Sequence, residues 1–395
     1  MFKNMLKLAL VSLLIYSQVA ICSHEAAVVC DSTTRTVLVY RDFGHKGDEN
    51  QIKGVLAAYS EIVPNVKITE FDVGQGNDLK LAAEKAVKTN KHEPVVLAAG
   101  EKTVEPFAAL LPLKGAVTVH MSHMVTKDHP ALVGKVDFIA LPKHAISDFE
   151  ELVKGSETHL IETIGVSHNR QIAAVEKAYQ DNKRDIPDVK SFVAIMLGGD
   201  APDENMKMKL YTQEDAQSEA RYVAKIADGR DIIILNGPRT GKHDPKTMQE
   251  IKTAHRDGKP DVRTADFVNE LKKSGVAPAQ IILKDFQFDD KHPNMDIVLG
   301  AVRATDSIFL VPGESTSTIS EAIDVLQPGK VKVYKHSAMS KVHEAHVQSE
   351  LEAGRIELLD DSFKEVAASK KGVHKGGPAP SAAKTIALAI SKAAK

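Results

Sequence analysis

The alternation of short apolar runs with helical patterns constrains the fold of this chain more than any other feature. The first series of apolar runs lies at residues 36–40, 66–71, 95–99, 116–120 and 136–141. The second series begins near Ser191, with runs at residues 192–197, 231–235, 280–283, 307–311, 331–334 and 356–359. Nearly continuous apolar runs of this length are typical of parallel strands covered on both faces. The two series predict an α/β fold of two Rossmann-like domains that face a cleft.

Helical spacing fills the gaps between these strands. Apolar residues recur with helical period at residues 52–62, and further helices are predicted at residues 78–88, 213–227, 264–274, 318–326 and 341–353. We expect a first domain at 35–150, a mainly polar and helical crossover at 151–188 and a second domain at 189–369. Residues 370–395 form a basic linker and a small amphipathic helix. This helix either docks back on the body or lies on a membrane surface, and docking is the simpler expectation.

Residues 1–26 are predicted to be a signal peptide. Lys3 and Lys7 precede an apolar stretch at 8–21, which is shorter than the about 20 apolar residues of a transmembrane helix. We therefore expect export to the periplasm or medium, and an uncleaved membrane anchor is the alternative. Cys22 and Cys30 are the only cysteines, so cleavage between them leaves one thiol and no intramolecular disulfide.

Composition excludes several classes of function. The formal net charge of −2 gives no reason to expect a nucleic-acid partner. Trp is absent and aromatic residues make up 5% of the chain, which argues against aromatic stacking platforms for sugars or bases. The histidine pairs at 120/123 and 343/346 lack a third ligand, so no metal site is predicted.

A run of hydroxyl residues marks the strongest candidate binding segment. The predicted strand at 307–311 leads into Gly313, Glu314 and then Ser315, Thr316, Ser317, Thr318, Ser320 and Glu321. Hydroxyl groups beside the free N–H groups of a helix start form a suitable phosphate site. The alternative is a capping box, because Thr318 and Glu321 have the required spacing and need no ligand.

Three other loops follow predicted strands. Gly44, His45 and Gly47 precede the first helix, Gly199 follows the first strand of the second series, and Arg239 and Lys242 follow the next. Glycines allow close approach of the backbone to a ligand, and a basic side chain can neutralise a phosphate. Each loop is explained equally well as an ordinary tight turn or a solvated basic turn.

Six blocks in chain order resemble the family of the plant mitochondrial fission factor and its bacterial relatives. Their patterns are G-x-E-N-Q, F-D-x-V-x-P-R-H-D, T-x-G-x-x-H, G-G, R-R-T-P and D-S-V-S-M-I-S-E-A. The corresponding positions are residues 47–51, 138–144, 163–168, 199–200, 239–240 and 314–322. Ala145, Gly241 and Glu314 depart from the family pattern, and Ala145 replaces the acid that follows the histidine.

Proteins of this family are similar to GT-B glycosyltransferases, in which the second domain holds a nucleotide-sugar and the first holds the acceptor. The resemblance implies that Glu321 holds the ribose. It assigns the diphosphate to the nucleotide side, made of Gly199, Arg239, Ser315, Thr316, Ser317, Thr318 and Ser320. It assigns the acceptor to a side made of Gly44, Gly47, Glu49, Gln51 and His144, with His45 as the base.

The resemblance thus implies a metal-independent glycosyltransferase without a cofactor, whose partner is a nucleotide-sugar or another phosphorylated small molecule. One alternative is a secreted, non-enzymatic interaction protein on the same fold, with a membrane or protein partner. The other is a periplasmic solute-binding protein, for which two or three crossings between the domains are expected.

Cleavage of the signal peptide is expected to leave a mature chain that begins between residues 22 and 27. Intact-mass analysis of protein recovered from the cell envelope or medium measures this start. A full-length mass in that fraction would contradict cleavage.

Overall fold

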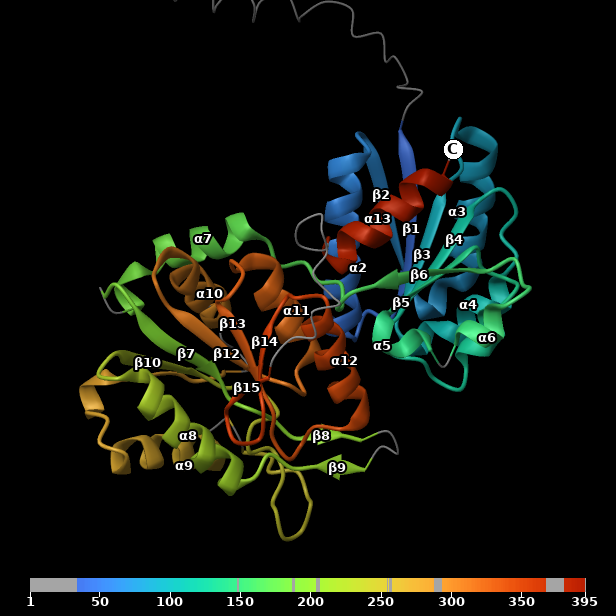
Figure 1. Cartoon of the computed structure of the whole chain (residues 1–395). Coiled ribbons are helices and arrows are strands. Elements are labelled where there is room, and N and C mark those ends of the chain that lie inside the picture. The colour runs from blue at the N-terminus through green and yellow to red at the C-terminus, as the bar shows by residue number, and fades with distance from the viewer. Residues whose placement is uncertain are drawn as a thin grey trace, which may run out of the picture.

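The chain folds into two α/β domains, each built around one sheet (Figure 1). The computed structural model describes residues 34–147, 149–186, 189–203, 207–253, 255, 258–287, 293–366 and 380–394. The expected signal peptide, both cysteines and most of the predicted basic linker lie outside these ranges. No helix in the described ranges is long and apolar enough to span a bilayer.

The first sheet has six parallel strands in the order β2-β1-β3-β4-β5-β6. Its strands are β1 Arg35–Arg41, β2 Val66–Asp72, β3 Val95–Ala99, β4 Val117–Met121, β5 Phe138–Pro142 and β6 His159–Thr163. The strand order reverses between β1 and β3, so the loops after these two strands flank the crevice where ligands usually bind.

The second sheet has seven strands in the order β11-β10-β7-β12-β13-β14-β15. They are β7 Phe192–Met196, β10 Asp231–Leu235, β11 Ile281–Lys284, β12 Ile308–Pro312, β13 Val331–Tyr334, β14 Glu357–Leu359 and β15 Glu365–Val366. All pair in parallel except β15, which is antiparallel to β14. The parallel strands thus have the Rossmann order, which reverses between β7 and β12. A separate short hairpin pairs β8 Ala201–Pro202 with β9 Met208–Lys209.

Helices cover both faces of each sheet. In the first domain they are α2 Lys46–Ile62, α3 Gly76–Thr89, α4 Val104–Leu110, α5 Lys143–Ile146 and α6 Glu150–Val153. In the second they are α7 Ile172–Asp181, α8 Gln213–Ala227, α9 Val262–Lys273, α10 Asn294–Ala304, α11 Thr316–Val325 and α12 Lys341–Glu352. Short 3-10 turns lie at Val73–Gln75, Glu101–Thr103, His129–Leu132, Lys183–Asp185 and Pro278–Gln280. Each sheet is therefore buried between two apolar layers.

The two Rossmann-like domains and eleven predicted strands are confirmed, with bounds that shift by one or two residues. The prediction for the crossover was wrong in part, because β6 lies within it and completes the first sheet. This edge strand alternates exposed His159 and Glu162 with buried Ile161 and Thr163, so it has no continuous apolar run. Helix α10 was also missed, since its sequence is apolar on nearly every side and lacks a helical stripe.

The C-terminal helix α13, Ala382–Ala393, docks on the first domain, as expected. Figure 1 shows α13 lying beside α2, although the two helices come from opposite ends of the chain. Ile386, Ala387 and Ile390 enter the same apolar cluster as the inner face of α2, and Arg35 donates a hydrogen bond to the Ala394 carbonyl at 3.0 Å. The apolar face of α13 is thus buried in the fold and does not form the membrane-facing surface of the alternative.

Truncation of Ile386 to Ala is expected to destabilise the first domain by about 2–5 kcal/mol, because its side chain is only 3% exposed in this cluster. Leu81→Ala is the matched control. Leu81 is 64% exposed on α3, so its truncation should change stability by no more than about 0.5 kcal/mol. Urea unfolding followed by circular dichroism measures both, and equal losses would show that the docking of α13 contributes nothing.

Candidate functional site

A cavity of about 420 Å³ opens at the carboxyl ends of β7, β10 and β11. Its size is typical of small-molecule pockets, and this edge is where parallel sheets bind ligands. The N-terminal ends of α10 and α11 close its other side. Its lining, here named the edge pocket, consists of Arg170, Met196, Leu235, Asn236, Gly237, Pro238, Lys284, Phe286, Gln287, Pro293, Asn294, Met295, Asp296, Thr318 and Glu321.

The structure places Glu321 and Thr318 together in this pocket, but without the capping box. Helix α11 begins at Thr316 with Ser315 as its N-cap, so Glu321 lies in the second turn and not in the first. The Ser315 hydroxyl donates a hydrogen bond to Thr318 Oγ1 at 2.8 Å. The carboxylate of Glu321 instead contacts Arg170 of the crossover at 3.0 Å. The capping-box hypothesis is therefore wrong.

Ser320 and Gly199 form hydrogen bonds within the protein. The Ser320 hydroxyl is buried, accepts a hydrogen bond from the Val166 amide at 3.0 Å and donates to the Thr316 carbonyl at 3.1 Å. The Gly199 amide donates to Glu314 Oε1 at 2.7 Å. Because both groups already have buried partners, the geometry does not favour their predicted contact with a diphosphate. Thr316 and Ser317 remain at the accessible start of α11.

Glu314 fills the crevice between β7 and β12, where the strand order of the second sheet reverses. Its carboxylate pairs with His336, and both side chains are buried. Burial alone raises the pKa of Glu314, but His336, Arg239 and the Gly199 amide outweigh it and hold that pKa below its ordinary value. Burial lowers the pKa of His336, and the Glu314 carboxylate outweighs this and raises it. Buried side chains therefore occupy this crevice, and the edge pocket lies beside it.

Arg239 lies directly after the pocket residue Pro238 and is partly buried. Its backbone carbonyl accepts a hydrogen bond from the Asp200 amide at 3.0 Å, which fixes the turn. Within the described residues its side chain forms no ion pair. Arg239 does not line the edge pocket itself, and its charge acts on the buried Glu314 carboxylate beside it.

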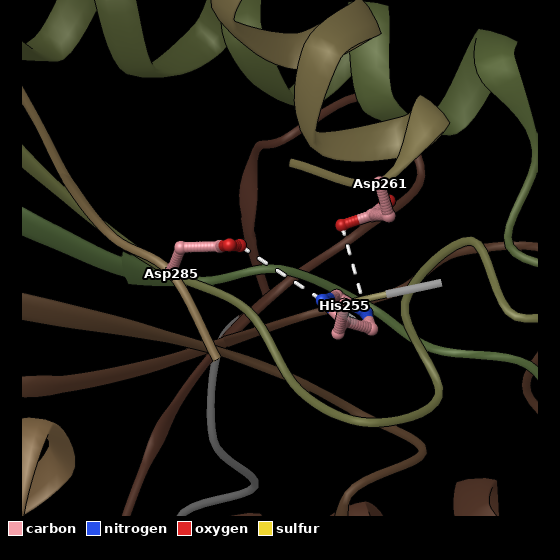
Figure 2. Close-up of side chains that lie close together, drawn as sticks. All are labelled: His255, Asp261 and Asp285. Carbon is pink, nitrogen blue, oxygen red and sulfur yellow. Dashed lines mark ion pairs between the residues drawn. The ribbon is translucent and has the colours of Figure 1, made fainter. Parts of the chain in front are cut away.

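The floor of the pocket rests on a buried charged cluster, shown in Figure 2. His255 lies between two carboxylates, with Nε2 3.8 Å from Asp261 Oδ2 and Nδ1 3.8 Å from Asp285 Oδ1. The Asn236 amide donates to Asp285 Oδ1 at 2.6 Å and to Asp261 Oδ2 at 3.2 Å. The Asn236 side-chain oxygen accepts from the Phe286 amide at 2.6 Å. The cluster therefore ties together the two strand ends that carry Asn236 and Phe286.

This cluster is the only group of three metal-ligand side chains in the described residues. The Asn236 amide nitrogen lies within hydrogen-bond reach of both carboxylates, where a shared cation needs to sit. His255 Nε2 lies 3.0 Å from the Thr240 carbonyl, an acceptor, so this nitrogen carries a proton. Both observations fit a protonated histidine between two carboxylates better than a bound metal.

In the first domain, His45 and Asp48 form a pair at the crevice between β1 and β3. His45 is the N-cap residue of α2, and its Nδ1 lies 3.0 Å from Asp48 Oδ2. Burial raises the pKa of Asp48, while His45 opposes the shift. Gly100, with φ +89°, leaves room for this carboxylate, because a Cβ there would lie 2.0 Å from Asp48 Oδ2. The imidazole is half exposed and is held by one nitrogen, a suitable geometry for a general base.

The other acceptor-side residues separate into two groups. Gly44 and Gly47 are exposed beside His45, whereas Gln51 is buried in α2. Glu49 pairs with Lys53 and lies 3.8 Å from Arg41. His144 lies apart from them on α5, and its ring packs edge-on against His346 of the second domain at 5.0 Å.

Helices α5 and α12 bring the two domains together at this histidine contact. Helix α5 follows β5, α12 follows β13, and the two helices pack against each other. Lys143 lies 3.5 Å from Glu352 across the same contact. Burial lowers the pKa of His144 to about 4, so this ring is neutral at pH 7. His144 thus belongs to the contact between the domains.

Several pocket residues were missed by sequence analysis. Lys284 and Phe286 follow a predicted strand. Ligands bind at the carboxyl ends of parallel strands, and this rule, the carboxyl-edge rule, could have identified both residues. Arg170 lies about 150 residues before Glu321, and no local pattern connects the two. The sequence therefore indicated the edge but not the side chains that come to it from other elements.

No protein-family model matches this chain, and no curated protein matches it. The resemblance to the mitochondrial fission family thus has no support beyond the six sequence blocks. Similar solved structures include MurG from Acinetobacter baumannii, with 10% identity, coverage of 91% of this chain and 99% of that chain, and a TM-score of 0.43. Anabaena HepE in complex with UDP and glucose matches with 10% identity, coverage of 91% and 95%, and a TM-score of 0.40.

UDP-GlcNAc 2-epimerase from Methanocaldococcus jannaschii, in complex with UDP-GlcNAc and UDP, is also similar. It has 11% identity, coverage of 91% of this chain and 100% of that chain, and a TM-score of 0.37. At these identities and TM-scores, the similarity carries no inference about function.

The charged cluster predicts a pH dependence of stability. Burial lowers the pKa of His255, but Asp285, the Thr240 carbonyl and Asp261 outweigh this and raise it above 6.5. Because the pKa of His255 is higher in the folded chain than in the unfolded chain, protonation of His255 stabilises the fold. This stabilisation is complete below the pKa of the unfolded chain, about 6.5, and is lost as pH rises through the pKa of the folded chain. His255→Asn, chosen because Asn tolerates the φ of +61° here, should remove this loss.

Chemical unfolding of wild type and His255→Asn across pH 5–9 measures the difference between their free energies of unfolding. That difference should shrink as pH rises. A difference that stays constant across this range would show that His255 does not titrate within the cluster.

Proposed function

We propose that the chain binds a nucleoside diphosphate, as the free nucleotide or as a nucleotide-sugar, in the edge pocket. The observation that carries the proposal is the position of Glu321, whose carboxylate lines a 420 Å³ pocket at the carboxyl edge of a Rossmann-ordered sheet. Its Oε1 accepts no hydrogen bond from the described part of the chain. A partly exposed carboxylate oxygen is a strong acceptor for a ribose hydroxyl.

The pocket and the residues next to it supply groups for the other parts of such a ligand. Free N–H groups at the start of α11, with the hydroxyls of Thr316, Ser317 and Thr318, suit a diphosphate. Arg239, the next residue in the chain after the lining residue Pro238, adds a positive charge to this edge, as a metal-independent site requires. The apolar surfaces of Phe286 and Met295 suit a nucleobase.

We further propose that the reaction is glycosyl transfer to a hydroxyl held by the first domain. His45 accepts the proton of the acceptor hydroxyl, and Asp48 orients its ring and stabilises the charge that forms. The acceptor oxygen then forms a bond to the anomeric carbon, and the nucleoside diphosphate leaves. The contact between α5 and α12 supports the proposal, because it holds the two domains that carry these groups against each other.

Replacing Glu321 with Gln is expected to weaken binding of the preferred nucleoside diphosphate by about 1–2 kcal/mol, or about 5- to 30-fold in Kd, because a neutral amide is the weaker acceptor. Calorimetry with UDP, GDP, ADP, CDP and their sugar conjugates measures this. Glu176→Gln is the matched control, since Glu176 pairs with Arg303 at 2.8 Å on α7 and does not line the edge pocket.

Absence of binding to wild type by every member of the panel would overturn the proposal and favour an interaction protein on the same fold. Equal losses in Glu321→Gln and Glu176→Gln would show that Glu321 does not contact the ligand.

A further inference from the structure

The crossover between the domains is attached to helix α11 at three alternate residues. The Val166 amide donates to Ser320 Oγ at 3.0 Å, His168 Nε2 lies 3.0 Å from Asp324 Oδ2, and Arg170 contacts Glu321. On its other side the crossover touches the first domain. Gly54 of α2 packs so closely that a Cβ there would lie 1.9 Å from the His168 carbonyl oxygen. The crossover is thus held between a helix of each domain.

Arg170 binds Glu321 through one oxygen only. Its Nε and Nη2 lie 3.1 and 3.0 Å from the same atom, Glu321 Oε2. Its Nη1 pairs with Asp296 in the first turn of α10. A planar guanidinium with carboxylates on two sides has a fixed orientation. Arg170 therefore holds Oε2 and leaves Oε1 of Glu321 facing the pocket that both residues line.

Arg170 also lines a second cavity of about 530 Å³ between the domains, together with Gly54 of α2 and Lys384 of α13. Only Arg170 lines both this cavity and the edge pocket among the described residues. Its side chain is 19% exposed, so the guanidinium is largely shielded from water. A shielded ion pair holds its geometry better than a solvated one. The orientation of Glu321 consequently depends on a residue that belongs to neither sheet.

We propose that Arg170 is the positioning residue for ribose recognition: by holding Oε2 of Glu321, it directs Oε1 at the ribose hydroxyls. This inference rests on the proposed function and extends it, because it places the determinant of ribose preference on the crossover. Ribose preference is then coupled to the position of the crossover between the domains.

The test compares one ribonucleoside diphosphate, the tightest binder to wild type among UDP, GDP, ADP and CDP, with its 2′,3′-dideoxy counterpart. Calorimetry gives the ratio of the two Kd values for each variant. Loss of hydrogen bonds to a charged acceptor predicts that wild type prefers the ribose form by about 10- to 100-fold. In Arg170→Gln this ratio should fall several-fold towards one, because the Glu321 carboxylate is no longer oriented.

Arg170→Lys should give an intermediate ratio, since an ammonium keeps the charge without the planar fork. Arg303→Gln is the control, because Arg303 is a similarly shielded arginine, 24% exposed, that pairs with Glu176 and does not line the edge pocket. It should keep the wild-type ratio.

A wild-type ratio in Arg170→Gln, with or without weaker binding of both ligands, would overturn the inference and assign Arg170 a structural or direct ligand contact. If circular dichroism shows that Arg170→Gln does not fold, Arg170→Lys decides, and an unchanged ratio there overturns the inference. Absence of wild-type binding to every ribonucleotide would instead overturn the proposed function itself.

Discussion

The buried hydrogen bond between the Val166 amide and the Ser320 hydroxyl is the interaction on which the joining of the two domains depends. A buried amide without a partner costs about 1–3 kcal/mol, so the crossover is favoured in the one position where Ser320 meets it. The same helix begins at the carboxyl edge of the second sheet and carries Glu321. One element therefore serves both the attachment of the crossover and the wall of the pocket.

The shielding of both sheets explains why so much of the fold could be predicted. A parallel strand covered on two faces is apolar at nearly every position, so β3, β7 and β12 appear in the sequence as uninterrupted apolar runs. The edge strand β6 is exposed at His159 and Glu162 and has no such run. Helix α10 was not predicted for the opposite reason: it is buried on several sides, so its sequence lacks the polar face that marks an amphipathic helix.

The site was less predictable than the fold, because its side chains converge from separate elements. The carboxyl-edge rule identified the segment that contains Thr318 and Glu321. A run of hydroxyl residues does not show which hydroxyl faces the protein interior, so Ser320 and Thr318 could not be distinguished. Arg170 became a pocket residue only through the path of the crossover, which depends on how the two finished domains pack.

The docking of α13 has a consequence for the order in which the domains are completed. The strands and helices of the second domain lie between residues 172 and 366, whereas the first domain needs Ile386 and Ile390 to finish its apolar layer. Because a ribosome makes the chain from its N-terminus, the domain that is started first is completed last. During synthesis the side of α2 that contacts α13 thus remains uncovered until the residues of α13 have emerged.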